Sequence, residues 1–203
     1  MNAVHTARHV RARPAMAVLG SGAAAGLVAS LAISALVLLA EKVAMLPVGT
    51  FYLVLVAAVS QGAGYGALAV AQGLLLHLLA GTVLGLILSA SFALSRKAYD
   101  SLGRLAPAYG LAAGFLIWTA LFVPVTFGMM IPVLQSLEGQ PEISQRLPVG
   151  DLSRVAVTDL LAMTDRVIYT ALAFNMFYGL LVFVMMRAFA GAILERKKPQ
   201  VIL

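Results

Sequence analysis

Long apolar stretches, separated by shorter polar segments, dominate the sequence. Four of these stretches are long enough to cross a membrane as helices, because about 20 consecutive apolar residues span the hydrocarbon core. A spanning chain must satisfy its backbone hydrogen bonds internally, and helices do this within one segment. We therefore predict that residues 1–203 form a single all-α membrane domain, a polytopic helical bundle. Its four spans cover residues 14–40, 67–95, 105–131 and 167–189.

A shorter apolar stretch, residues 45–61, lies between the first two spans and contains no charged residue. It is followed by a glycine-rich run that includes Gly62 and Gly66, and glycines weaken a helix. Its 17 residues could form a short span, a re-entrant segment or an interfacial helix. We favour four full spans plus a short re-entrant or interfacial segment, because the charges of the polar segments described next require it, with five spans as the alternative. Because backbone at membrane depth has to be covered, we expect this segment to pack against the bundle.

The polar segments differ in charge. Residues 1–13 and 190–203 form basic tails, and residues 96–104 form a basic loop, whereas residues 133–165 are rich in acidic residues. Lys and Arg concentrate on the cytoplasmic side of membrane proteins. We therefore predict that both tails and the basic loop are cytoplasmic and that residues 133–165 are external. All three basic segments can share one side only if four spans, not five, cross the membrane.

Three boundary details follow from the same pattern. Glu41 and Lys42 end the first span, and we expect both side chains to be in water. Pro132 is expected to end the third span, because proline cannot donate the backbone hydrogen bond of a helix. In the external segment, Asp151 is placed to cap a short amphipathic helix from about Leu152 to Met163.

Composition supports a membrane location. The chain is 62% hydrophobic and 11% charged, whereas soluble domains are nearer half apolar and a quarter charged. Lipid has to cover the excess apolar surface, and an integral protein of the plasma membrane is expected. The net charge of +6 lies at tails and helix ends, which indicates lipid headgroups, not nucleic acid, as its partners. The absence of cysteine excludes disulfides, zinc–thiolate sites and thiol nucleophiles.

Pairs of glycines four residues apart recur along the chain. This spacing lets the backbones of two helices approach closely in a membrane. The simpler interpretation is packing within the bundle, and the alternative is an interface with a second copy or another membrane subunit. The pairs are Gly22–Gly26, Gly62–Gly66, Gly81–Gly85 and Gly110–Gly114.

Three polar residues inside the predicted spans are candidates for ligand binding. His77 is the only histidine in these spans, and an ionisable residue at such depth is a candidate functional residue. It lies about ten residues, or roughly 15 Å, from the outer end of its span. Asn175 lies at a similar depth, and Thr126 adds a hydroxyl beside Pro124. From the similar depth of these side chains we predict a polar pocket near the midplane of the membrane. The alternative is that His77 and Asn175 only make structural hydrogen bonds.

The sequence contains no enzyme signature. It lacks the His-Glu-x-x-His, Gly-x-Ser-x-Gly and Walker patterns, and we predict no catalytic residues, no metal site and no cofactor. The favoured function is that of a non-enzymatic multi-pass protein that packs as a subunit of a homo-oligomer or of a larger membrane complex. The alternative is a small-solute or ion transporter, a channel or a substrate-binding membrane subunit that uses the polar pocket.

Overall fold

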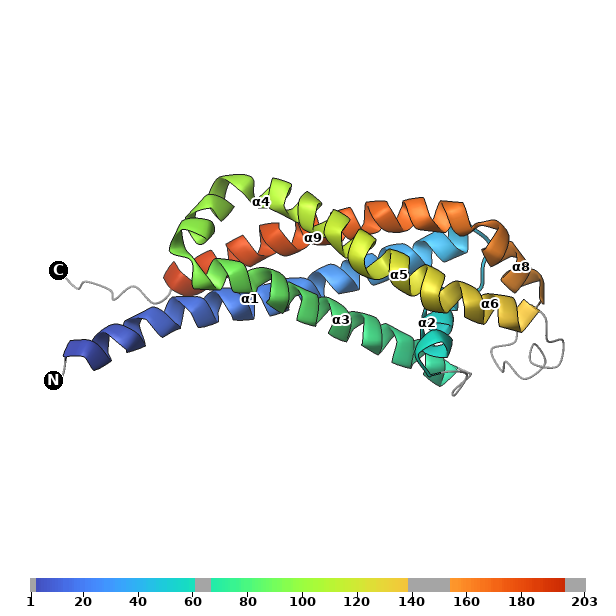
Figure 1. The fold of residues 1–203 in the computed structure, drawn as a ribbon, viewed down its shortest axis with the longest axis horizontal. Helices are drawn as coiled ribbons and strands as arrows, with labels where there is room; N and C mark the ends of the chain where they lie inside the picture. Colours follow the sequence, from blue (N-terminus) through green and yellow to red (C-terminus); the bar gives the residue numbers. More distant parts are fainter. Residues whose placement is uncertain (1–2, 61–66, 139–153, 196–203) are drawn as a thin grey trace. The chain divides into compact units, whose positions relative to one another are not determined.

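Helices make up nearly all of the backbone in the computed structural model, which describes residues 3–60, 67–138 and 154–195 (Figure 1). Strands are absent from this described part of the chain. Four of its helices are long and apolar enough to cross a membrane, so the all-α bundle with four spans is confirmed. These candidate spans are Ala15–Val43, Leu68–Leu94, Lys97–Ser136 and Thr164–Ile193.

The helices that contain the first, second and fourth spans lie close to their expected positions. Helix α1 runs over Ala3–Val43 and therefore includes most of the segment expected to be a tail. Helix α3 covers Ala67–Leu94, almost as predicted. Helix α9 covers Thr164–Glu195 and extends beyond the predicted residues 167–189 at both ends.

The expected basic loop, residues 96–104, is helical, so this prediction was wrong. Helix α4 runs over Arg96–Ile117 and starts directly after Ser95. The Ala98 N–H donates to Ser95 Oγ (3.3 Å), and the Tyr99 N–H donates to the Ser95 carbonyl (3.0 Å). Ser95 therefore caps the new helix, because its hydroxyl replaces a missing acceptor in the first turn. The connection between α3 and α4 is reduced to this one residue.

The third span does not end at Pro132, which corrects a second boundary. After α4 the helix continues through Glu138, and its proline residues fall beside widened π-helical turns. In these turns the Val123 N–H bonds the Trp118 carbonyl, and the Ile131 N–H bonds the Thr126 carbonyl. Such local adjustments let a membrane helix pass a proline without breaking. The successive segments are η1 (Trp118–Phe122), α5 (Val123–Val125), η2 (Thr126–Met130) and α6 (Ile131–Glu138).

The helices divide into two compact units, each with its own packing. The first unit draws on residues 1–30, 79–114 and 176–203. The second unit draws on residues 31–78 and 115–175. The second unit also contains the short helices α2 (Thr50–Ser60) and α8 (Arg154–Ala162). Of the predicted amphipathic helix in residues 152–163, the structure thus shows α8, while its cap Asp151 lies outside the described residues.

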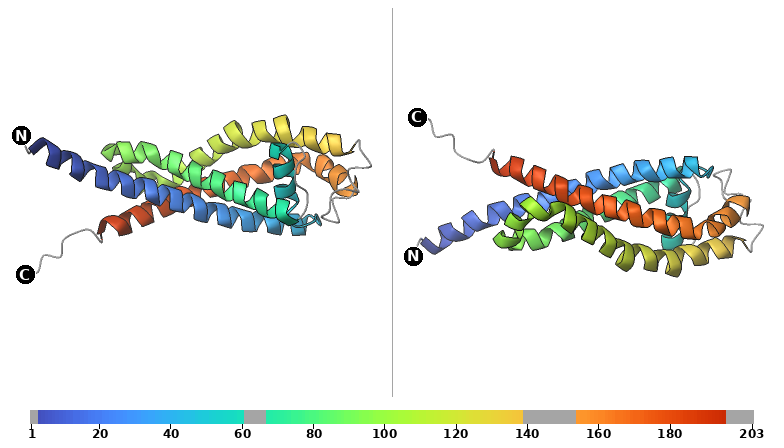
Figure 2. Two further views of the ribbon diagram at one scale, coloured as in Figure 1. Left: turned by 90° about the horizontal axis from the view of Figure 1, so that it is seen from below. Right: turned by 90° about the horizontal axis from the view of Figure 1, so that it is seen from above.

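Helix α2 is the short segment whose ability to span was in question. Its 11 residues rise by only about 16 Å, roughly half of the hydrocarbon thickness, so it cannot cross. In Figures 1 and 2 it runs across the direction of the neighbouring part of α3. Its packing against other helices is confirmed, because most of its side chains are buried. The buried residues are Thr50, Tyr52, Leu53, Val54, Val56, Ala57 and Ala58.

The apolar faces of α2 belong to two small cores in the second unit. Leu53 and Val56 pack with Ala69 of α3. On another face, Val54 and Ala58 meet side chains of η2, α6 and α8, namely Met130, Leu134 and Val157. Helix α2 is therefore held by contacts with several helices and not by lipid alone.

Candidate functional site

The carboxylate of Glu41 joins the end of α1 to the start of α2. Its Oε2 accepts the Gly49 N–H and its Oε1 accepts the Phe51 N–H, each at 2.6 Å. The first N–H groups of a helix have no intrahelical acceptor and carry partial positive charge, so they favour a carboxylate. Glu41 is only 6% exposed, and its expected position in water was wrong. Lys42 is exposed, as predicted.

A sharp turn after α1 makes this contact possible. The Leu46 N–H bonds the Glu41 carbonyl (2.9 Å) and the Met45 N–H bonds the Lys42 carbonyl (3.2 Å), as in a Schellman motif. Met45 takes the left-handed position with φ 60°. Gly49 has φ 98°, and a side-chain carbon there would lie 2.8 Å from Val70 Cγ1. The turn therefore needs glycine at position 49 both for its backbone conformation and for space.

An aromatic cluster forms where α2 meets α3. The ring centroids of Phe51 and Tyr52 lie 6.1 Å and 6.0 Å from that of His77, in edge-to-face arrangements. Gly73 allows this approach, because a side-chain carbon there would lie 2.7 Å from Tyr52 Cβ. His77 follows Gly73 by four residues, so both lie on the same face of α3. The absence of a side chain at Gly73 thus helps to bring Tyr52 against the histidine.

Four buried polar atoms around α2 make no hydrogen bond to any described protein group. They belong to four different helical segments, and all lie in the second unit. The side chains of Tyr52, Ser34 and Thr126 are 0%, 4% and 5% exposed. The Tyr52 and Ser34 hydroxyls are near enough to be candidate hydrogen-bond partners of each other, but the pair does not have the geometry of a formed hydrogen bond. The atoms are Ser34 Oγ, Tyr52 OH, His77 Nε2 and Thr126 Oγ1.

Buried polar atoms elsewhere in the described chain find partners. Trp118 Nε1 donates to the Ile168 carbonyl (3.1 Å), and Tyr178 OH donates to the Gly81 carbonyl (2.6 Å). The buried hydroxyls of Ser21 and Ser30 donate to carbonyls one turn earlier. A buried polar group without a partner costs about 1–3 kcal/mol, so native proteins rarely retain one. The concentration of such atoms around α2 therefore marks a candidate binding site.

The predicted site residues take different positions with respect to this cluster. His77 and Thr126 both contribute an unpartnered atom to it. Asn175 instead donates through Nδ2 to the carbonyl of Ala171 in its own helix (2.8 Å), and its pairing with His77 stays a prediction. Sequence reasoning missed Ser34 and Tyr52, because single hydroxyls are common in apolar helices.

Thr126 lies on the face of its helix that meets α2. It is buried, as is Met130 one turn later, and Met130 packs against Val54 and Ala58 of α2. Residues four apart lie on the same face of a helix, so the Thr126 hydroxyl points to the same side as this contact. Pro124 precedes it by two residues, between the two π-helical turns. Irregular turns of this kind occur frequently at functional sites.

Three of the four predicted glycine motifs lie at close helix contacts within the first unit. Helices α1 and α3 approach each other through the Gly22–Gly26 and Gly81–Gly85 motifs. A side-chain carbon on Gly22 would lie 2.6 Å from the Gly85 carbonyl oxygen, and one on Gly85 would lie 2.8 Å from Gly26 Cα. Gly81 is also buried there, against Ser30 and Gly26.

The Gly110–Gly114 motif of α4 meets α9. A side-chain carbon on Gly110 would lie 2.6 Å from Leu180 Cα, and one on Gly179 would lie 2.8 Å from the Gly114 nitrogen. The remaining motif, Gly62–Gly66, lies outside the described residues. The motifs that the structure describes are therefore in contact with other helices of the same chain.

Comparisons with protein-family models, with curated proteins and with solved structures found no significant match to this chain. Among the residues that the structure describes, no group of three His, Asp or Glu side chains is arranged to hold a metal ion. A functional proposal therefore has to start from the polar cluster around α2.

Proposed function

We propose that this protein is a non-enzymatic membrane protein that binds a small, uncharged polar solute beside α2, as a transporter or a substrate-binding subunit. The observation that carries the proposal is the set of four buried, unpartnered polar atoms around this helix. A solute with several hydrogen-bonding groups would supply partners that these atoms lack in the structure.

The chemistry of these atoms favours an uncharged solute. Serine, threonine and tyrosine hydroxyls donate and accept, and a neutral imidazole offers one donor and one acceptor. None of these groups carries a fixed charge at neutral pH. The nearby carboxylate of Glu41 already accepts two backbone N–H groups, so its charge is balanced by the start of α2 and is not exposed to a ligand.

The backbone around the cluster supports transport over a purely structural role. Short or discontinuous helices commonly mark the substrate sites of membrane transporters, and α2 is such a helix. The alternative of a packing subunit drew its support from the glycine motifs. Because the described motifs contact helices of the same chain, they provide little support for an interface with a second copy.

The proposal predicts opposite effects for two tyrosines. Tyr52→Phe removes an unpartnered hydroxyl, so we expect the melting temperature to stay constant or rise while solute flux falls by roughly tenfold. The control Tyr178→Phe removes the hydroxyl bonded to the Gly81 carbonyl, which should lower the melting temperature and leave flux per folded protein unchanged. Uptake into proteoliposomes measures flux, with urea and glycerol as uncharged solutes and sodium and chloride as charged solutes for comparison. Thermal unfolding measures stability.

A second hydroxyl tests whether the cluster acts as one site. Thr126→Val removes the unpartnered Oγ1 with little change in shape, and we expect it to reduce uptake of the same solute as Tyr52→Phe. Wild-type uptake of every solute by both variants would exclude solute binding at α2.

We also propose that the protein lies in the plasma membrane with both termini and the start of α4 in the cytoplasm. Exposed Asp100 and Gln135 stand near opposite ends of one 40-residue span. In a chain without native cysteine, Asp100→Cys should react with an impermeant thiol reagent only after the membrane is opened. Gln135→Cys should react in intact cells. The reverse pattern would invert the proposed orientation.

A further inference from the structure

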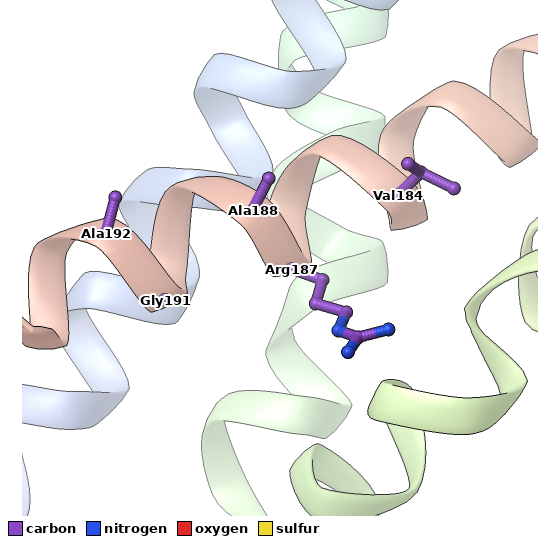
Figure 3. Close-up of a pocket in the computed structure, with 5 residues that line it drawn as sticks. All are labelled: Val184, Arg187, Ala188, Gly191 and Ala192. Carbon is purple, nitrogen blue, oxygen red and sulfur yellow. The ribbon is translucent and has the colours of Figure 1, made fainter.

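A shallow groove runs along the second half of α9, in the first unit. Its volume is about 460 Å³, and its lining is mostly small and apolar, with one cationic side chain (Figure 3). The lining residues are Val184, Arg187, Ala188, Gly191 and Ala192. A side-chain carbon added at Gly191 would meet no atom within 4 Å, so the groove is open there.

A backbone defect in α4 fixes the position of Arg187. Pro107 lies inside this helix and has no N–H, so it cannot bond the carbonyl four residues earlier. That carbonyl belongs to Gly103, and Arg187 Nη1 donates to it. Figure 3 shows the guanidinium extending from α9 toward a neighbouring helix. Arg187 is thus anchored by one of its five N–H donors, and no other described protein group accepts from it.

The depth of Arg187 indicates what its other donors meet. It precedes Ile193, the end of the candidate span, by six residues, or about 9 Å along the helix. The side chain is exposed, so at this depth of a candidate span it would face lipid and not protein. A guanidinium at this level requires an anionic partner or a path to the headgroups. Lys97 and Arg104, both exposed on α4, add positive charge in the same unit.

We propose that Arg187 and the α9 groove form a binding site for an anionic phospholipid. The planar guanidinium binds the headgroup phosphate, whose oxygens match its paired N–H donors. One acyl chain lies along the small side chains of Ala188, Gly191 and Ala192. Phospholipid fits better than a free anion because the charged group is continuous with an apolar groove. The site is independent of the solute site beside α2, since the two use different units.

Two variants test the headgroup and the groove separately. Arg187→Gln removes the charge, and Gly191→Leu fills the groove while keeping the arginine. We expect each to reduce bound phosphatidylglycerol by roughly tenfold, as counted by native mass spectrometry of the full-length protein in detergent. The matched controls are Arg166→Gln, an exposed arginine of the second unit, and Gly128→Leu, where a side chain also meets no atom within 4 Å. Both controls should retain wild-type lipid.

The choice of lipid and competitor completes the test. Phosphatidylglycerol should bind more tightly than phosphatidylcholine, and added inorganic phosphate should not displace it. Wild-type phosphatidylglycerol binding by both Arg187→Gln and Gly191→Leu would overturn the proposal. Displacement by phosphate together with unchanged binding in Gly191→Leu would overturn it too, because the site would then recognise a free anion.

Discussion

Leucine at both Gly81 and Gly85 is expected to abolish the fold of this protein. Both glycines face α1: a side-chain carbon on Gly85 would lie 2.8 Å from Gly26 Cα, and one on Gly81 would overlap the Ser30 hydroxyl. Backbone atoms cannot move aside as side chains do, so α1 and α3 would have to separate. Overpacking in a core ordinarily costs about 1–3 kcal/mol per site, and two adjacent sites without room to relax should exceed this. The yield of monodisperse protein in detergent measures the effect.

Gly20→Leu is the matched control for this experiment. Gly20 lies on α1 near the same contact in sequence, but a side-chain carbon there meets no atom within 4 Å. We expect it to fold with a wild-type melting temperature. A Gly81→Leu/Gly85→Leu protein that stays monodisperse and equally stable would contradict the close approach of α1 and α3. A folded protein that only changes its oligomeric size would instead assign these glycines to an interface between copies.

Replacing Glu41 by leucine should detach the start of α2. The substitution removes the acceptor of the Gly49 and Phe51 N–H groups, and hydrogen bonds to a charged group contribute about 1.5–3 kcal/mol each. We therefore expect a loss of roughly 3 kcal/mol or more in the free energy of unfolding. Hydrogen exchange should show faster exchange of the Gly49 and Phe51 amides. Solute uptake should fall as well, because Tyr52 follows directly.

Two further variants define the role of the carboxylate. Glu41→Gln keeps one acceptor oxygen but places an amide N–H₂ group near the second of the two backbone N–H donors. The stability of this variant should therefore lie between those of wild type and Glu41→Leu. Lys42→Leu changes the neighbouring exposed charge and should leave exchange at Gly49 unchanged. Unaltered exchange at Gly49 and Phe51 in Glu41→Leu would show that the turn holds α2 without the carboxylate.

The sequence alone determined the features that depend on length and on contact with lipid. About 20 apolar residues form a spanning helix whatever surrounds them, so the four spans were predictable from their composition. The charges of the polar segments favoured four spans over five, and the need to cover a segment that does not cross predicted that residues 45–61 pack against the bundle. The glycine spacing likewise identified helix faces capable of close approach.

Two helix boundaries that we predicted wrongly from composition are determined by local hydrogen bonds. Ser95 was counted with the preceding span, but its hydroxyl caps α4, and residues 96–104 are helical as a result. Pro132 was expected to end a helix, but the Ile131 N–H bonds the Thr126 carbonyl across a π-helical turn. In a membrane no water is present to satisfy freed backbone groups, so a widened turn replaces the break that proline would cause in solution.

Only the tertiary structure decided which polar groups meet. A nearly uniform apolar span has no polar face, so its sequence does not reveal which side of the helix turns inward. Ser34 and Tyr52 were therefore not distinguishable from other hydroxyls along the chain. Glu41 was assigned to water because it ends a span, yet the six-residue turn over 44–49 brings the start of α2 back to it. The turn between α1 and α2, with its left-handed residues Met45 and Gly49, determines the partner of that carboxylate.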